Sequence, residues 1–112
     1  MPSKWSVPIN HRAAVTQADA ADPAAASAGI DTTEYSQCRF DVSLSSGTPS
    51  YPVELQVLFW NSRLGAFVRG AKSQLSELPA AVVVDCRGAT VYAKVTQLAG
   101  TNPSIAIDYS LS

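Results

Sequence analysis

The sequence predicts an all-β fold: a small antiparallel β-sandwich or jelly-roll-like domain with an extended N-terminal arm. Apolar and polar residues alternate with period two along residues 35–45 and 53–60, as they do in strands with one buried face. Six predicted strands follow one another every 10 to 15 residues, joined by Gly, Pro and Asn turns, which is typical of two packed sheets or a small barrel. Residues 1–30 show neither pattern.

The first thirty residues are predicted to be an arm, and residues 31–112 the β domain. Alanine and proline dominate the arm, and alanine side chains bury too little surface to order such a segment alone. We therefore expect a neighbouring chain to hold it. The apolar exceptions are predicted anchors, which could add a short strand to a partner's sheet edge or fill an apolar groove: Trp5, Val7, Ile9 and Val15. The alternative for Trp5 is that it folds back and caps the core of its own domain.

The first clear strand spans about residues 35–45, and its inward positions are Cys38, Phe40, Val42 and Leu44. A loop at residues 46–50 is expected to end its pairing. The next strand, at residues 53–60, has the pattern of a central strand. Its alternation fails at Leu58 and Trp60, so something must cover its second face near Trp60, and a partner subunit could supply that cover.

The remaining elements follow from the turn residues. Residues 61–65 are predicted to be a hairpin connection in which Gly65 takes a positive φ. This connection leads into a strand at residues 66–69, and short strands are then predicted at residues 81–86, 90–98 and 104–111. The last of them ends the chain, and we expect it to be an edge on which a partner strand could pair.

Catalytic and metal-binding patterns are not visible. Cys38 and Cys86 are expected to be buried free thiols. The single histidine, His11, lies in the arm, so no ligand cluster with zinc spacing and no suitable base for a cysteine nucleophile is formed. The carboxylates that could act as an acid–base pair fall at solvent-facing positions: Asp41, Glu54, Asp85 and Asp108. We expect a protein that is not an enzyme and has no cofactor or metal.

Charge is scarce in this chain, since 15% of residues are charged and the formal net charge is −1. An average globular domain has about 25% charged residues, so part of this surface is expected to be covered in an assembly. Scattered Lys and Arg argue against nucleic acid as a partner. No apolar run reaches the roughly 18 residues that a membrane span needs, and no secretory leader is visible. We expect synthesis in the cytosol, followed by retention there or departure inside a larger particle.

Exposed aromatic residues offer a function of another class. Tyr51, Trp60 and Tyr92 could stack on a sugar ring, with Glu54 and Asn61 near Trp60 as polar partners. A carbohydrate-binding module is therefore the alternative to an assembly protein.

An Ala-rich, Pro-punctuated arm followed by a compact β domain resembles the small accessory proteins of tailed-bacteriophage virions, especially capsid decoration (cement) proteins. The run VYAKVTQLAGTNPSIAIDYS, residues 91–110, looks like the last hairpin of such β domains. The resemblance implies a virion protein, made in the host cytoplasm, that binds the major capsid protein and copies of itself as a dimer or trimer. Trp5, Val7 and Ile9 would then contact the capsid. Head–tail connector and tail-fibre components have similar parts and remain alternatives.

Overall fold

The computed structural model describes residues 4–112 and contains one six-stranded antiparallel sheet. The elements in chain order are β1 (Ile9–Val15), a short 3-10 turn η1 (Ala26–Ala28), β2 (Ile30–Asp31), β3 (Gln37–Asn61), β4 (Ala66–Leu75), β5 (Ala80–Asp85) and β6 (Thr90–Leu111). The prediction of a small, antiparallel, all-β domain is confirmed. None of the helices within residues 4–112 has the length and apolar character needed to cross a bilayer.

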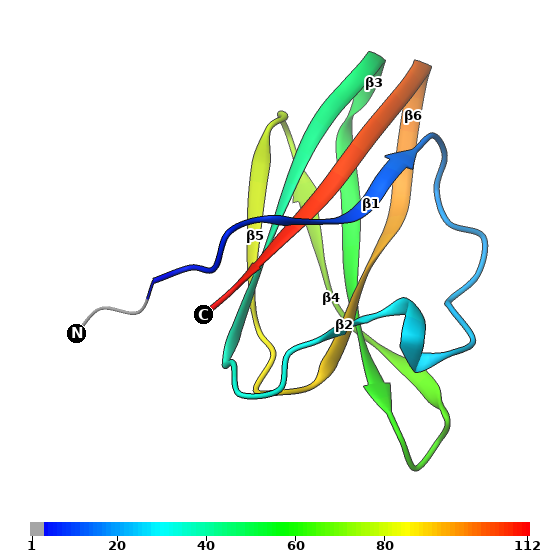
Figure 1. Ribbon diagram of the computed structural model, residues 1–112. Helices are drawn as coiled ribbons and strands as arrows, with labels where there is room; N and C mark the ends of the chain where they lie inside the picture. The colour runs from blue at the N-terminus through cyan, green and yellow to red at the C-terminus, as the bar shows by residue number, and fades with distance from the viewer. Residues whose placement is uncertain (1–3) are drawn as a thin grey trace.

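Two long strands, β3 and β6, organise the sheet by pairing along almost their whole length (Figure 1). The start of β3 pairs with the end of β6, from Cys38 opposite Leu111 to Ser46 opposite Ser104. The end of β3 pairs with the start of β6, from Glu54 opposite Gln97 to Phe59 opposite Val91. Separate strands were expected at 35–45 and 53–60, and at 90–98 and 104–111. That expectation is wrong, because the ladder continues through both predicted turns.

The two strands can bend together because glycines lie where their backbones come closest. Gly47 has φ +78°, and a Cβ there would lie 2.0 Å from the carbonyl oxygen of Asn102. Gly100 has φ +127°, and a Cβ there would lie 2.2 Å from the carbonyl oxygen of Thr48. No side chain fits at either position. The Gly and Pro residues that suggested a break in pairing instead allow a bend within it.

The bend divides the sheet into two halves. The first half-sheet has the strand order β5, residues 37–46 of β3, residues 104–111 of β6, and β1. The second half-sheet has β4, residues 53–61 of β3, residues 90–98 of β6, and β2. One buried apolar cluster takes residues from both halves, including Phe40, Ile107, Leu55 and Val95. The inner faces of the two half-sheets therefore share a core.

The predicted inward positions are mostly correct. Cys38, Phe40 and Val42 are fully buried, as are Ile105 and Ile107. Leu44 was also expected to face the core, but it is exposed, because it lies beside the ladder irregularity that begins the bend. The hairpin at residues 61–65 is confirmed. Gly65 has a φ of +63°, and the Asn61 side-chain oxygen accepts hydrogen bonds from the N–H groups of Arg63 and Leu64.

The last strand is not an edge, contrary to expectation, because β1 pairs with its free side. Ile9 lies opposite Tyr109 and Val15 lies opposite Ile105. The place that the sequence left open for a partner strand is thus occupied by the chain's own N-terminal segment. The division into an arm of residues 1–30 and a separate domain does not describe residues 9–15, which belong to the sheet.

Candidate partner-binding surface

The first described residues lie along the first half-sheet and hold two apolar side chains in solvent. Ser6 is fixed to the end of β6, since its N–H donates to the Leu111 carbonyl at 2.8 Å and its hydroxyl accepts from the Leu111 N–H at 2.8 Å. The side chain of Val7 is 81% exposed and that of Ile9 is 53% exposed. The predicted anchors Val7 and Ile9 are therefore available to a partner, on a backbone that is already held at Ser6.

Trp5 lies outside the core, so it does not cap the interior of its own domain. The Arg39 guanidinium sits over its ring, with its carbon 5.2 Å from the ring centroid, which is a cation–π arrangement. Arg39 projects from the outer face of the first half-sheet, because its neighbours Cys38 and Phe40 point into the core. Trp5 is partly exposed there and lies two residues before Val7 in the same segment.

Val15 cannot be an anchor for another subunit. It is buried in the chain's own core, opposite Ile105 of β6. The prediction is wrong because a segment with little apolar surface can still pack on its own chain when its backbone pairs with a strand. One buried valine at the end of β1 is enough to connect the N-terminal segment to the core, because the backbone ladder with β6 supplies the remaining stabilisation.

His11 was expected in a poorly ordered arm, and this expectation is also wrong. It lies at an irregularity of β1, between Asn10 and Arg12, and turns towards the aromatic rings of Phe40, Tyr92 and Tyr109. Its Nε2 accepts the N–H of Ala93 at 3.2 Å. Burial, with the nearby Arg12 charge, lowers the pKa of His11 to about 4. The ring is therefore neutral at pH 7 and links the two half-sheets: its backbone is in the first, and its bond is to the second.

Residues 16–28, which we call the strap, run from β1 towards β2 and are tied to the second half-sheet. Asp19 accepts both guanidinium nitrogens of Arg12, one of them at 2.8 Å, and also the N–H of Val95 at 2.8 Å. The Asp19 N–H donates to the Val95 carbonyl at 2.7 Å. Burial alone would raise the pKa of Asp19, but the hydrogen bonds from Arg12 and Val95 outweigh it and hold that pKa below its usual value.

A second acidic residue of the strap holds two basic residues of the sheet. Asp22 accepts the Lys94 ammonium at 2.7 Å and the Arg69 guanidinium at 3.1 Å. The hydrogen bond from Lys94 lowers the pKa of Asp22, with help from Arg69. Lys94 was expected to face solvent. It does face outwards from the core, but it is buried, because the strap is its partner on the outer face.

The strap also explains the apolar second face of the central strand. Leu58 is fully buried although it points away from the core that Val57 and Leu55 line. Its ladder partners are Arg69 of β4 and Tyr92 of β6, and Arg69 is bound to Asp22 of the strap. The cover predicted near Trp60 exists, and the strap contributes to it from the same chain.

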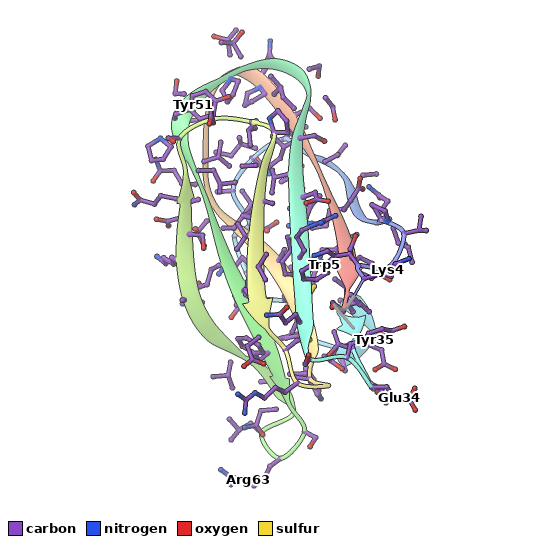
Figure 2. The ribbon with its side chains drawn as sticks, turned by 90° about the vertical axis from the view of Figure 1, so that its left-hand side faces the viewer. Lys4, Trp5, Glu34, Tyr35, Tyr51 and Arg63 are labelled. Atoms are coloured by element: carbon purple, nitrogen blue, oxygen red, sulfur yellow. The ribbon has the colours of Figure 1, made fainter. Side chains whose placement is uncertain are left out.

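The predicted aromatic surface is not one surface. Trp60 packs edge-on against Phe67 with ring centroids 5.1 Å apart, and Phe67 lies 6.0 Å from Tyr92. Tyr92 is further occupied by the Arg12 guanidinium, 5.3 Å from its centroid. Tyr51 lies at the bend, at the opposite end of the molecule from the turn that holds Arg63 (Figure 2). Tyr51 and Trp60 are nine positions apart along β3, which corresponds to roughly 30 Å of extended strand.

The cysteines and carboxylates considered for catalysis or metal binding are either buried or paired with other side chains. Both cysteines are free and buried, and burial, with the nearby Cys86, raises the pKa of Cys38 to about 12, so its thiol stays protonated. The four candidate carboxylates each have a partner: Asp41 with Arg39, Glu54 with Thr96, Asp85 with Arg87 and Asp108 with Asn10. Over residues 4–112, no pocket and no group of three potential metal ligands is found.

Sequence reasoning missed the residues that attach the N-terminal segment, which are His11, Arg12, Asp19 and Asp22. The sequence does contain one sign of this attachment, which is the presence of opposite charges on the strap and on the sheet. Among many alanines, the strap has two acidic residues. In the predicted strands, Lys94 falls at an expected solvent-facing position and Arg69 ends the strand at residues 66–69. Their pairing depends on the path of the chain, which the sequence pattern does not give.

Comparison of the chain with protein-family models, with curated proteins and with solved structures finds no match.

Proposed function

We propose that this protein is a non-enzymatic structural protein that attaches to the surface of another protein through Val7 and Ile9. The observation that carries the proposal is the exposure of these two side chains on a backbone fixed to β6 at Ser6. A binding segment that is already extended and held loses less conformational entropy when it docks. Trp5, partly exposed beside them, adds an aromatic residue of the kind that dominates binding energy at interfaces.

The particular role we propose is that of a capsid decoration protein, which bridges and stabilises neighbouring capsid subunits in a virion. Its partners would be the major capsid protein and further copies of itself. The low charge of the chain supports an assembled state. A head–tail connector or tail-fibre component would use the same surface and is the alternative. We do not propose carbohydrate binding, because Tyr51 is far from Trp60, and Tyr92 is occupied by Arg12 and His11.

The structure changes how far such a bridge could reach. Residues 9–22 are bound to the chain's own sheet through β1, Asp19 and Asp22. The partner must therefore come to the segment that ends at Ile9. A long arm that threads across several subunits is not part of the proposal.

The test is attachment to particles assembled from the coat protein that is encoded with this chain. We expect the purified protein to co-sediment with these particles, and the double variant Val7→Asp, Ile9→Asp to bind about 100-fold more weakly or worse. Two apolar side chains of this size each contribute about 1.5 to 3 kcal/mol when fully buried. The variant should keep the thermal midpoint of the parent protein, since both side chains already face solvent.

Leu64→Asp is the matched control. Leu64 is 56% exposed, as Ile9 is to a similar degree, but it lies in the turn between β3 and β4. We expect this variant to bind as the parent does. Equal loss in the control and in the double variant, or a parent protein that stays in the supernatant, would contradict the proposal.

A further inference from the structure

The edge strands β1, β4 and β5 differ in how they are protected against pairing with a strand of another molecule. Strand β1 has two register shifts, and β4, an edge of the second half-sheet, has Arg69 and Lys72. Irregular pairing and charge both prevent an edge from accepting another strand. Strand β5, of sequence AAVVVD, is regularly paired with β3 and has no charge before its last residue.

The backbone groups that β5 directs away from the sheet follow from its pairing with β3. The Cys86 N–H donates to the Ser36 carbonyl at 2.9 Å, so Cys86 directs its backbone groups towards the strand that β3 continues. The Gln37 N–H donates to the Ser112 carbonyl, on the β6 side of β3. Backbone groups of an antiparallel strand alternate in direction, so residues 80, 82 and 84 face β3. Ala81, Val83 and Asp85 therefore direct their N–H and C=O groups outwards. Among residues 4–112, no strand pairs with this side of β5.

These outward residues are arranged symmetrically about Val83. If a second β5 pairs antiparallel with a two-fold axis at Val83, Val83 faces its own copy and Ala81 faces Asp85 of the other chain. All six N–H and C=O groups of each strand's outward side then have a partner. No like charges face each other, because Asp85 meets alanine and Arg87 meets Pro79. Val83 is the large apolar side chain of β5 that is most exposed, at 51%, and it would be covered on the axis.

We propose that β5 is the surface through which two copies of this chain form a dimer, by antiparallel pairing centred on Val83. The occupant is a second copy because the outward groups of this strand complement themselves in one register. The inference deepens the proposed function and rests on its claim that the chain associates with itself. It assigns no role to Val7 and Ile9, which lie on the N-terminal segment.

The test is the mass of the purified protein by sedimentation equilibrium, from micromolar to millimolar concentration. We expect a monomer–dimer equilibrium in the parent protein and a monomer throughout for Val83→Lys, which places two like charges on the axis. Val83→Pro is the second variant, because it removes only an outward-directed N–H and leaves the ladder with β3 intact. Val68→Lys is the control, with the same charge change at an exposed edge position of β4, and it should dimerise as the parent does.

Val83→Cys offers a direct test of the interface, because a cysteine on the two-fold axis could form a disulfide with its copy. Paired Cα atoms on the axis would lie about 5.5 Å apart, within the range of a disulfide. We expect oxidation to give a covalent dimer, whereas Val68→Cys should stay monomeric under denaturing conditions. A monomeric parent protein, a trimer, or a dimer that Val83→Lys leaves intact would overturn the proposal.

Particle binding separates the two proposals. A monomeric Val83→Lys that still co-sediments would leave the attachment through Val7 and Ile9 standing by itself. A dimer that fails to co-sediment would leave the β5 interface standing and contradict the proposed attachment.

Discussion

The outer faces of the two half-sheets differ although both belong to the same two long strands. The face of the second half-sheet is covered by the strap, which pairs Asp19 with Arg12 and Asp22 with Lys94. On the first half-sheet, residues 4–9 leave Val7 and Ile9 exposed. The same N-terminal segment is thus closely attached at one end and presented to solvent at the other. Charge pairing and backbone bonds, rather than apolar content, decide where it is held.

The largest expected effect comes from deletions that separate these two parts. Removing residues 1–8 should cost about 1 kcal/mol, because mainly the two bonds of Ser6 with Leu111 and the Trp5–Arg39 contact are lost. Removing residues 1–15 takes away β1, His11 and buried Val15, and should cost more than about 5 kcal/mol, comparable with the total stability of a small domain. Urea unfolding followed by circular dichroism measures both. Equal stability of the two truncated proteins would contradict the difference between the two parts.

The next effect concerns the strap. Asp19→Ala leaves the Arg12 guanidinium and the Val95 N–H without their partner, and we expect a loss of about 2 to 3 kcal/mol in the free energy of unfolding. Asp85→Ala is the matched control, since Asp85 also pairs with an arginine but both side chains are largely exposed. Its effect should stay within about 0.5 kcal/mol. A control that loses as much as Asp19→Ala would show that the strap has no special role.

How much of this could be predicted from the sequence depends on which forces hold each part. The alternation of Cys38, Phe40 and Val42 fixed the inner face of β3, because burial of apolar residues on one face leaves a local pattern. The pairing of Asp22 with Lys94 leaves no such pattern, since the two residues are 72 positions apart. Val7, Ile9 and Val15 were all predicted to contact a partner, and the structure leaves only Val7 and Ile9 in solvent. Val15 is buried in its own chain, because β1 pairs with a strand that lies far along the sequence.

The third effect is a dependence of stability on pH that comes from His11. Its folded pKa of about 4 lies below the unfolded value of 6.5, so the unfolded chain takes up a proton first as the pH falls. Stability should therefore decrease by about 2 kcal/mol between pH 7 and pH 5, before the carboxylates with lowered pKa values contribute. His11→Gln removes the titrating group, so the urea midpoint of this variant should stay nearly constant between pH 7 and pH 5. A midpoint that falls as steeply in the variant would rule out His11 as the cause.

The smallest expected effect is the change in the free energy of unfolding when the exposed residues Val7 and Ile9 are replaced. Val7→Asp together with Ile9→Asp should change the free energy of unfolding by no more than about 0.5 kcal/mol, as is usual for exposed positions. Val15→Asp, on the same segment, should prevent folding, because it buries a carboxylate in the core. Circular dichroism shows whether each of the two variants folds, and thermal unfolding of the double variant beside the parent protein then locates the boundary between the attached and the exposed residues. A large loss in the double variant would mean that Val7 or Ile9 supports the fold.

The central claim is that the N-terminal segment orders on its own chain from β1 to the strap. The most direct measurement is amide hydrogen exchange by NMR, at a concentration where sedimentation shows a monomer. We predict that the amides of Asp19 and Val95, which are bound between strap and sheet, exchange at least about 100-fold more slowly than in an unfolded chain. The Val7 amide should exchange at close to the unfolded rate. An Asp19 amide that exchanges as fast as Val7 in the monomer would contradict the account.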